Sequence, residues 1–393
     1  MYLNDFKFIR ILKFVLSKCW FPFFTMQYRF FNKFNNNKKT IRLFTTTGNI
    51  SLINNLAIIN EIGDFDKYED ILFVDPGKGR EEFIKKTLQI ASLHEFKNIY
   101  FAVGTRLSSE LILKNIVNID ELYLLNHPKF IEPFIKVYDQ TPIILTDEGA
   151  ASLMDYGLDK IKNLKSFKTN KYLNKIDFMG LDNLSKINFE NIDMNEFQKI
   201  ANILSKQYPI SYKINPEDKA ILYCGIYWEV TGLSREKFVE IQSNMLNELL
   251  NAGYKILYKP HPRDNEFFGF DKNPNVIFID SKLPIEIYRL NVIAILSVSS
   301  TTSITSPHYW QIAGFSNIVE ESLAENPEDI TKNNIIRMII NEYSQNYKKL
   351  LEYDVIGTPR EELKTLIFED YMNFLDTKPI LSVNSLFKKE FTK

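Results

Sequence analysis

The chain has 393 residues, of which 45% are hydrophobic and 25% charged, and its formal net charge is −1. This length is typical of two domains, and this composition is typical of globular domains with hydrophobic cores. Two cysteines, Cys19 and Cys224, are too few for a disulfide scaffold or a cysteine-based zinc site. They fit a protein of the reducing cytoplasm.

Residues 1–39 are basic and aromatic, and carry a charge of +7 from eight Lys and Arg residues against one acid, Asp5. Basic residues interrupt every apolar run, so the segment is neither a secretory signal nor a transmembrane helix. The helical spacing of its apolar residues predicts a helix lying on an anionic membrane surface, the inner face of the cytoplasmic membrane. The alternative is a terminal helix packed on the protein with solvated basic residues.

From about residue 40 the pattern alternates between strand and helix. Helices are predicted at Ser51–Glu61 and Glu81–Leu93. The apolar runs between them predict strands at Ile41–Thr45, Ile71–Val74, Ile99–Val103, Leu122–Leu125 and Pro142–Thr146. Strands separated by helices indicate a parallel sheet covered on both faces.

Residues 150–218 lose this regularity and are interpreted as a trailing helix near Asn195–Lys206 plus a linker. The alternation restarts at Ala220, and from about residue 326 the chain is expected to be helical and to return towards the first domain. The second set of elements is Ile221–Cys224, Arg235–Asn251, Lys255–Tyr258, Val276–Ile279 and Val292–Leu296. We therefore predict an α/β protein with two doubly wound, Rossmann-like domains facing a cleft: residues 40–218 and 219–330, followed by C-terminal helices over 331–393.

In such sheets ligands bind beyond the carboxyl ends of the strands. Asp147-Glu148-Gly149 follows a strand of the first domain. Two adjacent carboxylates facing a cleft are suited to general-base work, because repulsion and partial burial raise one pKa. The alternative is a surface turn, since Asp and Gly are common turn residues.

Lys259-Pro260-His261-Pro262 follows a strand of the second domain. The prolines restrict the backbone on both sides and hold His261 rigidly, and a histidine beside a cation can donate a hydrogen bond to phosphate. The alternative is an ordinary loop histidine. The other His-Pro pair, at His127, lies in the first domain and lacks the lead of a strand followed by a lysine, so it is interpreted as structural.

The hydroxyl-rich tract Ser297–Ser303 contains Ser299 and Ser300 and follows another strand. Small hydroxyls and free N–H groups at a helix start form a phosphate cradle, or simply an N-cap. Glu286, at the start of a short helix, is suited to ribose hydroxyls but is also an ordinary helix-start acid. Gly225 would permit a ligand to approach the backbone.

Metal ligands are scarce. Asp64-Phe-Asp66 has the D-x-D pattern but precedes its strand, so it is interpreted as a solvated loop, and no metal site is predicted. Lys78, Arg80 and Arg106 lie in loops after first-domain strands and would suit an acidic sugar. No G-x-S-x-G, P-loop or G-x-G-x-x-G motif is present.

The order of these motifs resembles that of the bacterial GT-B sialyltransferases, the capsule polysialyltransferases and the lipooligosaccharide sialyltransferases. Asp147-Glu148-Gly149 resembles their D/E-D/E-G motif, His261-Pro262 their HP motif and Ser299-Ser300 their paired serines. The resemblance covers roughly residues 40–330 and is specific only at the motifs.

The resemblance implies a general base from the Asp147-Glu148 pair, with Glu148 preferred. It implies that His261 contacts the phosphate of CMP and assists its departure, and that Ser299 and Ser300 also hold this phosphate.

It further implies that Glu286 holds the cytidine ribose and that Gly225 and Lys259 lie along the nucleotide. Residues 40–218 would bind the acceptor and residues 219–330 the CMP donor. The implied activity is an inverting, metal-independent transfer of sialic acid from CMP-sialic acid to a hydroxyl of a capsular or lipooligosaccharide glycan, with no cofactor and no nucleic-acid partner.

Two alternatives remain open. One is another GT-B-like enzyme, such as a UDP-sugar 2-epimerase or a polyol-phosphate transferase, in which histidine and serine also hold phosphate. The other is a non-catalytic glycan-binding scaffold. The acceptor, the linkage, the number of transfers per encounter and the oligomeric state are not determined by the sequence.

Overall fold

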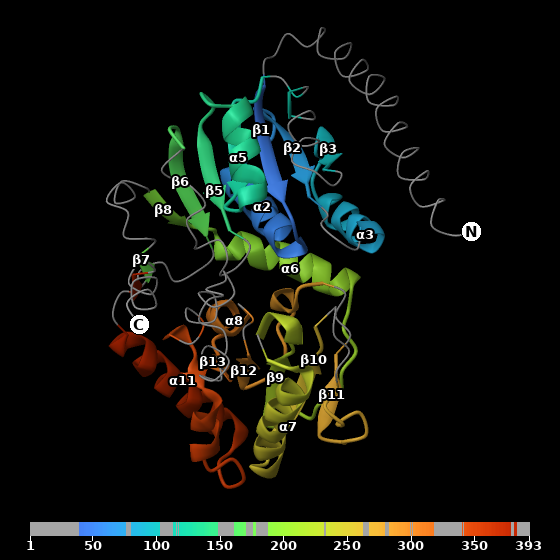
Figure 1. Cartoon of the computed structure of the whole chain (residues 1–393), viewed down its shortest axis with the longest axis vertical. Coiled ribbons are helices and arrows are strands. Elements are labelled where there is room, and N and C mark those ends of the chain that lie inside the picture. Colours follow the sequence, from blue (N-terminus) through green and yellow to red (C-terminus); the bar gives the residue numbers. More distant parts are fainter. Residues whose placement is uncertain are drawn as a thin grey trace, which may run out of the picture.

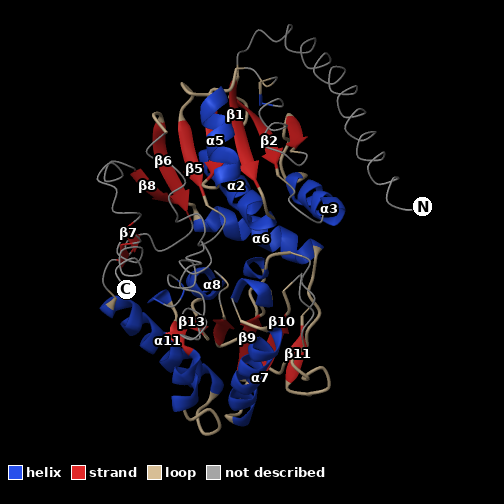
Figure 2. Ribbon diagram, viewed as in Figure 1, coloured by secondary structure: helices blue, strands red, loops and turns tan. Residues whose placement is uncertain are grey.

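The computed structural model describes residues 39–75, 80–102, 113–114, 116, 118–147, 161–169, 176–177, 188–231, 233–261, 267–279, 283–298, 300, 302–317, 340, 342–378 and 381–382. These residues form two parallel sheets with helices on both faces, which confirms the predicted α/β class (Figures 1 and 2). The predictions for residues 1–38, for Glu148-Gly149 and for Ser299 concern positions outside the described residues.

The first sheet has seven strands in the described part of the chain, all parallel. In spatial order they are β3 (Asn98–Phe101), β2 (Tyr68–Val74), β1 (Thr40–Thr46), β4 (Glu121–Leu125), β5 (Ile143–Thr146), β6 (Leu164–Thr169) and β8 (Asn188–Asn191). The chain winds outward from β1 to β3 and then resumes on the other side at β4, so the sheet is doubly wound.

Helices cover both faces of this sheet: α2 (Asn49–Ile62), α3 (Arg80–Ala91), α5 (Pro128–Val137) and α6 (Met194–Gln207). Residues 51–59 of α2 are all buried, as expected of a helix covered on every side. On the opposite face, the ring of Phe134 from α5 meets that of Phe73 edge-on, with centroids 5.3 Å apart.

The second sheet is also parallel, and its described strands number six. In spatial order they are β11 (Val276–Phe278), β10 (Lys255–Lys259), β9 (Ala220–Cys224), β12 (Ala294–Ser297), β13 (Ala313–Ser316) and β14 (Gln345–Asn346). Its helices are α7 (Arg235–Asn251), α8 (Thr302–Trp310) and α11 (Arg360–Thr377), with 3₁₀ helices at Trp228–Thr231, Ile285–Ile287 and Tyr347–Glu352.

Helix α8 packs so closely on β13 that one position there must be glycine. A Cβ at Gly314 would lie 1.9 Å from the carbonyl oxygen of Ser303 and 2.9 Å from Pro307. Neither the helix backbone nor a proline ring can retreat easily, so Gly314 sets the distance between α8 and the sheet.

Helix α6 lies between the two domains (Figure 1). Its N-cap, Asp193, accepts a hydrogen bond from the Asn195 N–H at 2.7 Å. Its buried face, Phe197, Ile200, Ala201 and Leu204, has the i, i+3, i+4, i+7 spacing of an amphipathic helix. The helix packs on α2 of the first domain and contacts the 3₁₀ helix Ile285–Ile287 of the second. The interface is therefore built on the segment that precedes the second domain.

Polar contacts continue this interface beyond α6. The hydroxyl of Tyr288 donates to the carbonyl of Tyr208 at 2.8 Å, and the N–H of Asn291 donates to the hydroxyl of Tyr212 at 3.3 Å. The segment between α6 and β9 is thus attached to the edge of the second domain rather than being a loose linker.

Two parts of the chain differ from the sequence interpretation. Residues 150–218 contribute two strands of the first sheet, β6 and β8, where only a helix and a linker were expected. Residues 345–346 form β14 of the second sheet, so the chain beyond 326 is not purely helical, and α11 packs on β12 and β13. After α11, the short strand β15 (Leu381–Ser382) pairs with β7 (Ile176–Asp177).

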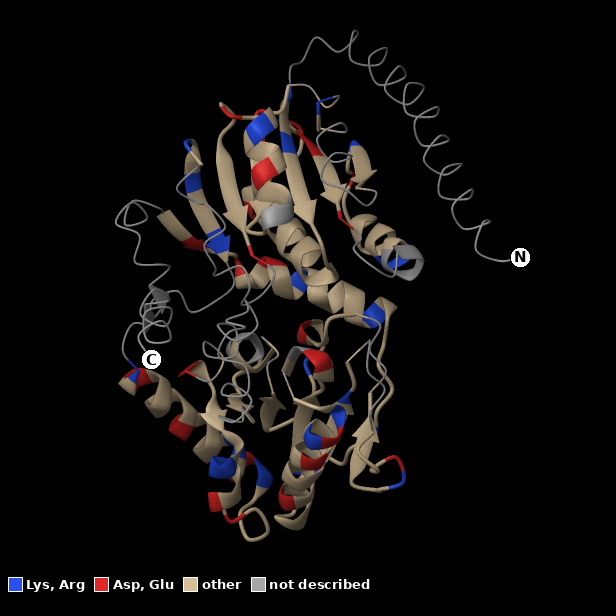
Figure 3. Cartoon of the chain, in the orientation of Figure 1, with Lys and Arg blue, Asp and Glu red and all other residues tan. Residues whose placement is uncertain are grey.

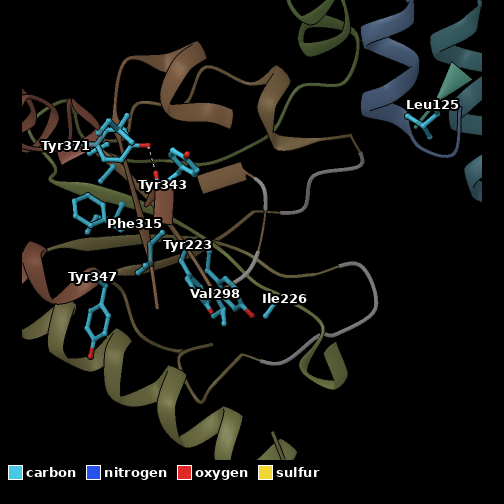
Figure 4. Packing of buried hydrophobic residues seen from close by; sticks show 14 of the residues in the cluster. Leu125, Tyr223, Ile226, Val298, Phe315, Tyr343, Tyr347 and Tyr371 are labelled. Carbon is cyan, nitrogen blue, oxygen red and sulfur yellow. Dashed lines mark hydrogen bonds between the residues drawn. The ribbon is translucent and has the colours of Figure 1, made fainter. Parts of the chain in front are cut away.

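The core of the second domain is rich in tyrosine. Figure 4 shows Tyr223, Phe315, Tyr343, Tyr347 and Tyr371, which belong to one hydrophobic cluster, and the Tyr371 hydroxyl donates to the Tyr343 carbonyl at 3.0 Å. Each buried hydroxyl of this kind needs a partner, and here the partner fastens α11 to the segment before β14.

The outer faces of α7 and α11 carry charges of both signs, as expected of solvated helices (Figure 3). In the described part of the chain, none of the helices has the length and hydrophobicity required to span a bilayer.

Candidate active site

At the carboxyl end of β5, Asp147 is buried, with 1% of its surface exposed. Its carboxylate accepts a hydrogen bond from the Thr169 hydroxyl at the end of the neighbouring strand β6. Its backbone carbonyl accepts from the side-chain amide of Asn54 in α2 at 3.1 Å, and Asn54 is itself fully buried. Asp147 is therefore fixed from two sides, and neither Thr169 nor Asn54 could be assigned from the sequence.

In the second domain, Gly225 makes room for the loop that carries His261. The N–H of Gly225 donates to the Lys259 carbonyl at 2.9 Å. A Cβ at this position would lie 3.0 Å from the Tyr258 side chain and 3.2 Å from the His261 nitrogen. The glycine thus allows the segments after β9 and β10 to approach each other. Contact with a nucleotide stays a prediction.

His261 is half-buried, and its ring stacks on that of Tyr227 with centroids 6.1 Å apart and planes inclined by 22°. The aromatic ring limits the orientations that the imidazole can adopt. Tyr227 follows β9, and sequence reasoning did not select it.

Lys259 and Glu286 each lie within electrostatic range of the buried Cys224. Burial raises the pKa of the Cys224 thiol to about 12, while the positive charge of Lys259 acts to lower it and the negative charge of Glu286 acts to raise it. Cys224 pairs with Lys259 in the register of β9 and β10. The structure therefore brings these two predicted site residues within electrostatic range of one buried atom.

Glu286 and Ser300 are joined through Thr302. The Thr302 hydroxyl donates to Oε1 of Glu286 at 2.8 Å, and the Ser300 hydroxyl donates to the Thr302 oxygen at 2.9 Å. The Thr302 N–H donates to the Ser300 oxygen at 3.3 Å. The hydroxyl-rich tract in the sequence pointed to this region, but not to Thr302 in particular.

The other hydroxyls of the tract shape the turn itself. Ser297 Oγ lies 2.9 Å from Ser303 Oγ and 3.1 Å from the Ser300 carbonyl, and Ser303 Oγ donates to the same carbonyl at 3.0 Å. These bonds tie the backbone of Ser300 to the end of β12 and to the first turn of α8, and a helix N-terminus offers N–H groups to an anion.

Packing connects the carboxylate site of the first domain with this cluster. Asn54, which holds Asp147, belongs to α2; α2 packs on α6, and α6 contacts the 3₁₀ helix that carries Glu286. Asp147 and Glu286 are thus connected through the packed helices α2 and α6.

The remaining predictions concern loops and metals. Lys78 and Arg106 lie outside the described residues, as does the side chain of Arg80. Asp64 and Asp66 form an exposed turn, where Asp64 pairs with Lys67 at 2.7 Å, as expected of a solvated loop. Within the described residues, no three or more His, Cys, Asp or Glu side chains are grouped to hold a metal ion.

Similar folds occur among solved structures. The UDP-GlcNAc 2-epimerase from Neisseria meningitidis, bound to UDP-GlcNAc, is 14% identical over 86% of this chain and all of that chain, with a TM-score of 0.50. UGT2 of Phytolacca americana, complexed with UDP-2-fluoro-glucose and pterostilbene, is 8% identical over 90% of this chain and all of that chain, with a TM-score of 0.52. These likenesses show the fold alone.

The GT-B domain of a sialyltransferase from Photobacterium damselae is 12% identical over 77% of this chain and 96% of that chain, with a TM-score of 0.43. That likeness is too distant to support an inference. The two parallel α/β sheets, together with the folds of the epimerase and of UGT2, give the chain the GT-B fold that the resemblance implied.

Sequence comparison gives the family. None of the curated proteins compared with the chain matches it. The family model of alpha-2,8-polysialyltransferases matches residues 25–319, which include both sheets up to β13 and every predicted site residue. The chain belongs to the alpha-2,8-polysialyltransferase family.

Proposed function

We propose that this protein transfers sialic acid from CMP-sialic acid to a hydroxyl of a cell-surface glycan, with inversion and without a metal ion. The observation that carries the proposal is the family match over residues 25–319. The family description names an alpha-2,8 linkage, which favours an acceptor glycan that already ends in sialic acid.

In the proposed reaction, a carboxylate of the Asp147-Glu148 pair removes the proton from the acceptor hydroxyl. The acceptor oxygen then forms a bond to the anomeric carbon of sialic acid, while the bond from that carbon to the CMP phosphate oxygen breaks. The electron pair leaves with CMP, and the general base retains the acceptor proton.

The leaving group is a phosphate monoester, whose developing charge is stabilised by His261, Ser299, Ser300 and N–H groups at the start of α8. The proximity of Lys259 to Cys224 supports a positive charge on the nucleotide side of this site. Donors of this kind stabilise the departing phosphate without requiring a divalent ion. Glu286 holds the ribose.

Nucleotide selectivity tests the proposal. We expect CMP to raise the melting temperature of the protein by several degrees in the presence of EDTA, because a ligand that binds only the folded state stabilises it. UMP and UDP should leave the melting temperature nearly unchanged. Protection by UDP in place of CMP would favour the epimerase-like alternative. With CMP-sialic acid and a sialylated acceptor, mass spectrometry should detect transfer, whereas a non-catalytic scaffold would give none.

The basic segment 1–39 is proposed to hold the protein on the inner face of the cytoplasmic membrane, on the sequence argument alone. Deleting residues 1–39, or replacing their eight Lys and Arg residues with Gln at unchanged length, should abolish co-sedimentation with vesicles containing anionic lipid. Transfer to a soluble acceptor should persist in both variants. Equal sedimentation of the deletion variant and the intact chain would disprove membrane attachment through this segment.

A further inference from the structure

Thr302 occupies a central position between two groups that bind different parts of the proposed donor. Its hydroxyl donates to Glu286 Oε1 and accepts from Ser300 Oγ. The carboxylate comes from the 3₁₀ helix after β11, and the serine from the turn after β12. A single side chain thus connects the ribose-binding and phosphate-binding segments.

The direction of this chain follows from its chemistry. A carboxylate oxygen only accepts hydrogen bonds, so Thr302 must give its one hydroxyl hydrogen to Glu286. Thr302 then has only lone pairs to offer Ser300, so Ser300 is the donor. In this arrangement the Ser300 hydrogen points towards Thr302, so it is not available to a phosphate.

The hydrogen bond between Thr302 and Glu286 is shielded from water, and both ends of helix α8 contact Glu286. Thr302 is 6% exposed, and hydrogen bonds in such surroundings are stronger than in water. Thr302 begins α8, and Trp310 at the end of α8 donates from its indole nitrogen to the Glu286 carbonyl at 3.4 Å. Helix α8 therefore holds both the side chain and the backbone of Glu286.

We propose that Thr302 is a positioning residue that couples recognition of the ribose hydroxyls to recognition of the 5′-phosphate. Thr302 occupies Oε1 of Glu286, so Oε2 is the atom that accepts from the ribose. A ribose hydroxyl donating to the carboxylate weakens its hold on Thr302, which frees the Ser300 hydroxyl to turn towards the phosphate. The inference rests on the proposed function and deepens it. The site selects ribonucleoside monophosphates because it recognises the ribose hydroxyls and the 5′-phosphate together.

The test compares CMP with 2′,3′-dideoxy-CMP by calorimetry. For the unaltered protein, CMP should bind at least about tenfold more tightly, because a hydrogen bond to a charged group is lost with the ribose hydroxyls. In Thr302→Val this preference should fall by about threefold or more, because Glu286 still accepts from the ribose but the effect transmitted to Ser300 and the phosphate is lost. Thr302→Ser, which retains the hydroxyl, should restore the preference.

Controls separate coupling from folding. Thr87→Val replaces another buried threonine, in α3 of the first domain, and should leave both affinities unchanged. Melting temperatures show whether each variant folds, and Thr302→Ala replaces Thr302→Val if that variant does not.

The outcomes are distinguishable. If Thr302→Val weakens the binding of CMP and of 2′,3′-dideoxy-CMP by the same factor, the ratio of their dissociation constants is unchanged. This result overturns the coupling and makes Thr302 purely structural. If the unaltered protein binds CMP and 2′,3′-dideoxy-CMP with nearly equal dissociation constants, the coupling is also overturned. The proposed function still stands in that case, because CMP binds. Failure to bind CMP at all overturns both.

Discussion

Replacing Glu148 with Gln or Asp147 with Asn is expected to reduce sialyl transfer, by about 10²–10⁴-fold for whichever residue is the general base. Each substitution removes the proton acceptor and preserves the size of the side chain. Asp147→Asn keeps an oxygen that can accept from Thr169, so the buried position remains hydrogen-bonded. The larger loss identifies the base. Turnover with CMP-sialic acid measures the effect.

Calorimetry with CMP provides the second readout for these variants. Affinity for CMP should be retained, because the proposed nucleotide ligands all belong to the second domain. Asp139→Asn, in an exposed turn before β5, is a matched control and should transfer at the normal rate. Near-normal transfer by both Asp147→Asn and Glu148→Gln would exclude the carboxylate pair as the source of the base.

Breaking the Arg42–Asp70 ion pair is expected to have the largest effect on stability, about 3–5 kcal/mol. Arg42 is fully buried and contacts both carboxylate oxygens of Asp70, at 2.6 and 2.8 Å, and His94 lies 2.8 Å from the same carboxylate. Arg42→Met leaves a buried carboxylate without its arginine, and Asp70→Asn leaves a buried guanidinium without its counter-charge. Denaturant unfolding measures the free energy. The exposed pair Asp64–Lys67 is the matched control, and Asp64→Asn should change stability little.

The same cluster gives the acid dependence of stability. Burial by itself raises the pKa of Asp70, but hydrogen bonds and charge from His94 and Arg42 outweigh it and hold the pKa below its usual value. The folded state therefore binds this proton less tightly than the unfolded state. Its stabilisation is complete above the unfolded pKa, about 4, and is lost as the pH falls through the folded pKa.

The stability difference between the unaltered protein and Asp70→Asn should accordingly shrink below about pH 4. A difference that stays constant down to pH 2.5 would contradict the assignment of this pKa shift to Asp70.

The sequence by itself determined the α/β class, most strand and helix positions, and the order of the polar segments that follow the strands. These features are local. Buried parallel strands appear as apolar runs, and α6 shows its buried face in the spacing of Phe197, Ile200 and Leu204. A residue just after a strand can be recognised without knowing which strand lies beside it, and so Asp147 and His261 could be selected as candidates; the structure places them after β5 and β10.

Strand β6 shows why two strands of the first sheet were missed. It contains Lys165 and Lys168, and a lysine in a short run argues against a buried strand. In the structure Lys168 is buried and paired with Glu61 of α2 at 3.0 Å and with Glu190 of β8 at 3.2 Å. Only partners distant in sequence make that lysine compatible with the sheet.

Tertiary structure alone decided how the predicted site residues are connected. Thr302 bridges Glu286 and Ser300, Thr169 and Asn54 hold Asp147, and Gly225 accommodates the His261 loop. Each of these contacts joins segments whose relative position depends on strand pairing and helix packing. Periodicity along the chain records the burial of a residue, but it does not record its neighbours, because those are set by the register of strands far apart in sequence.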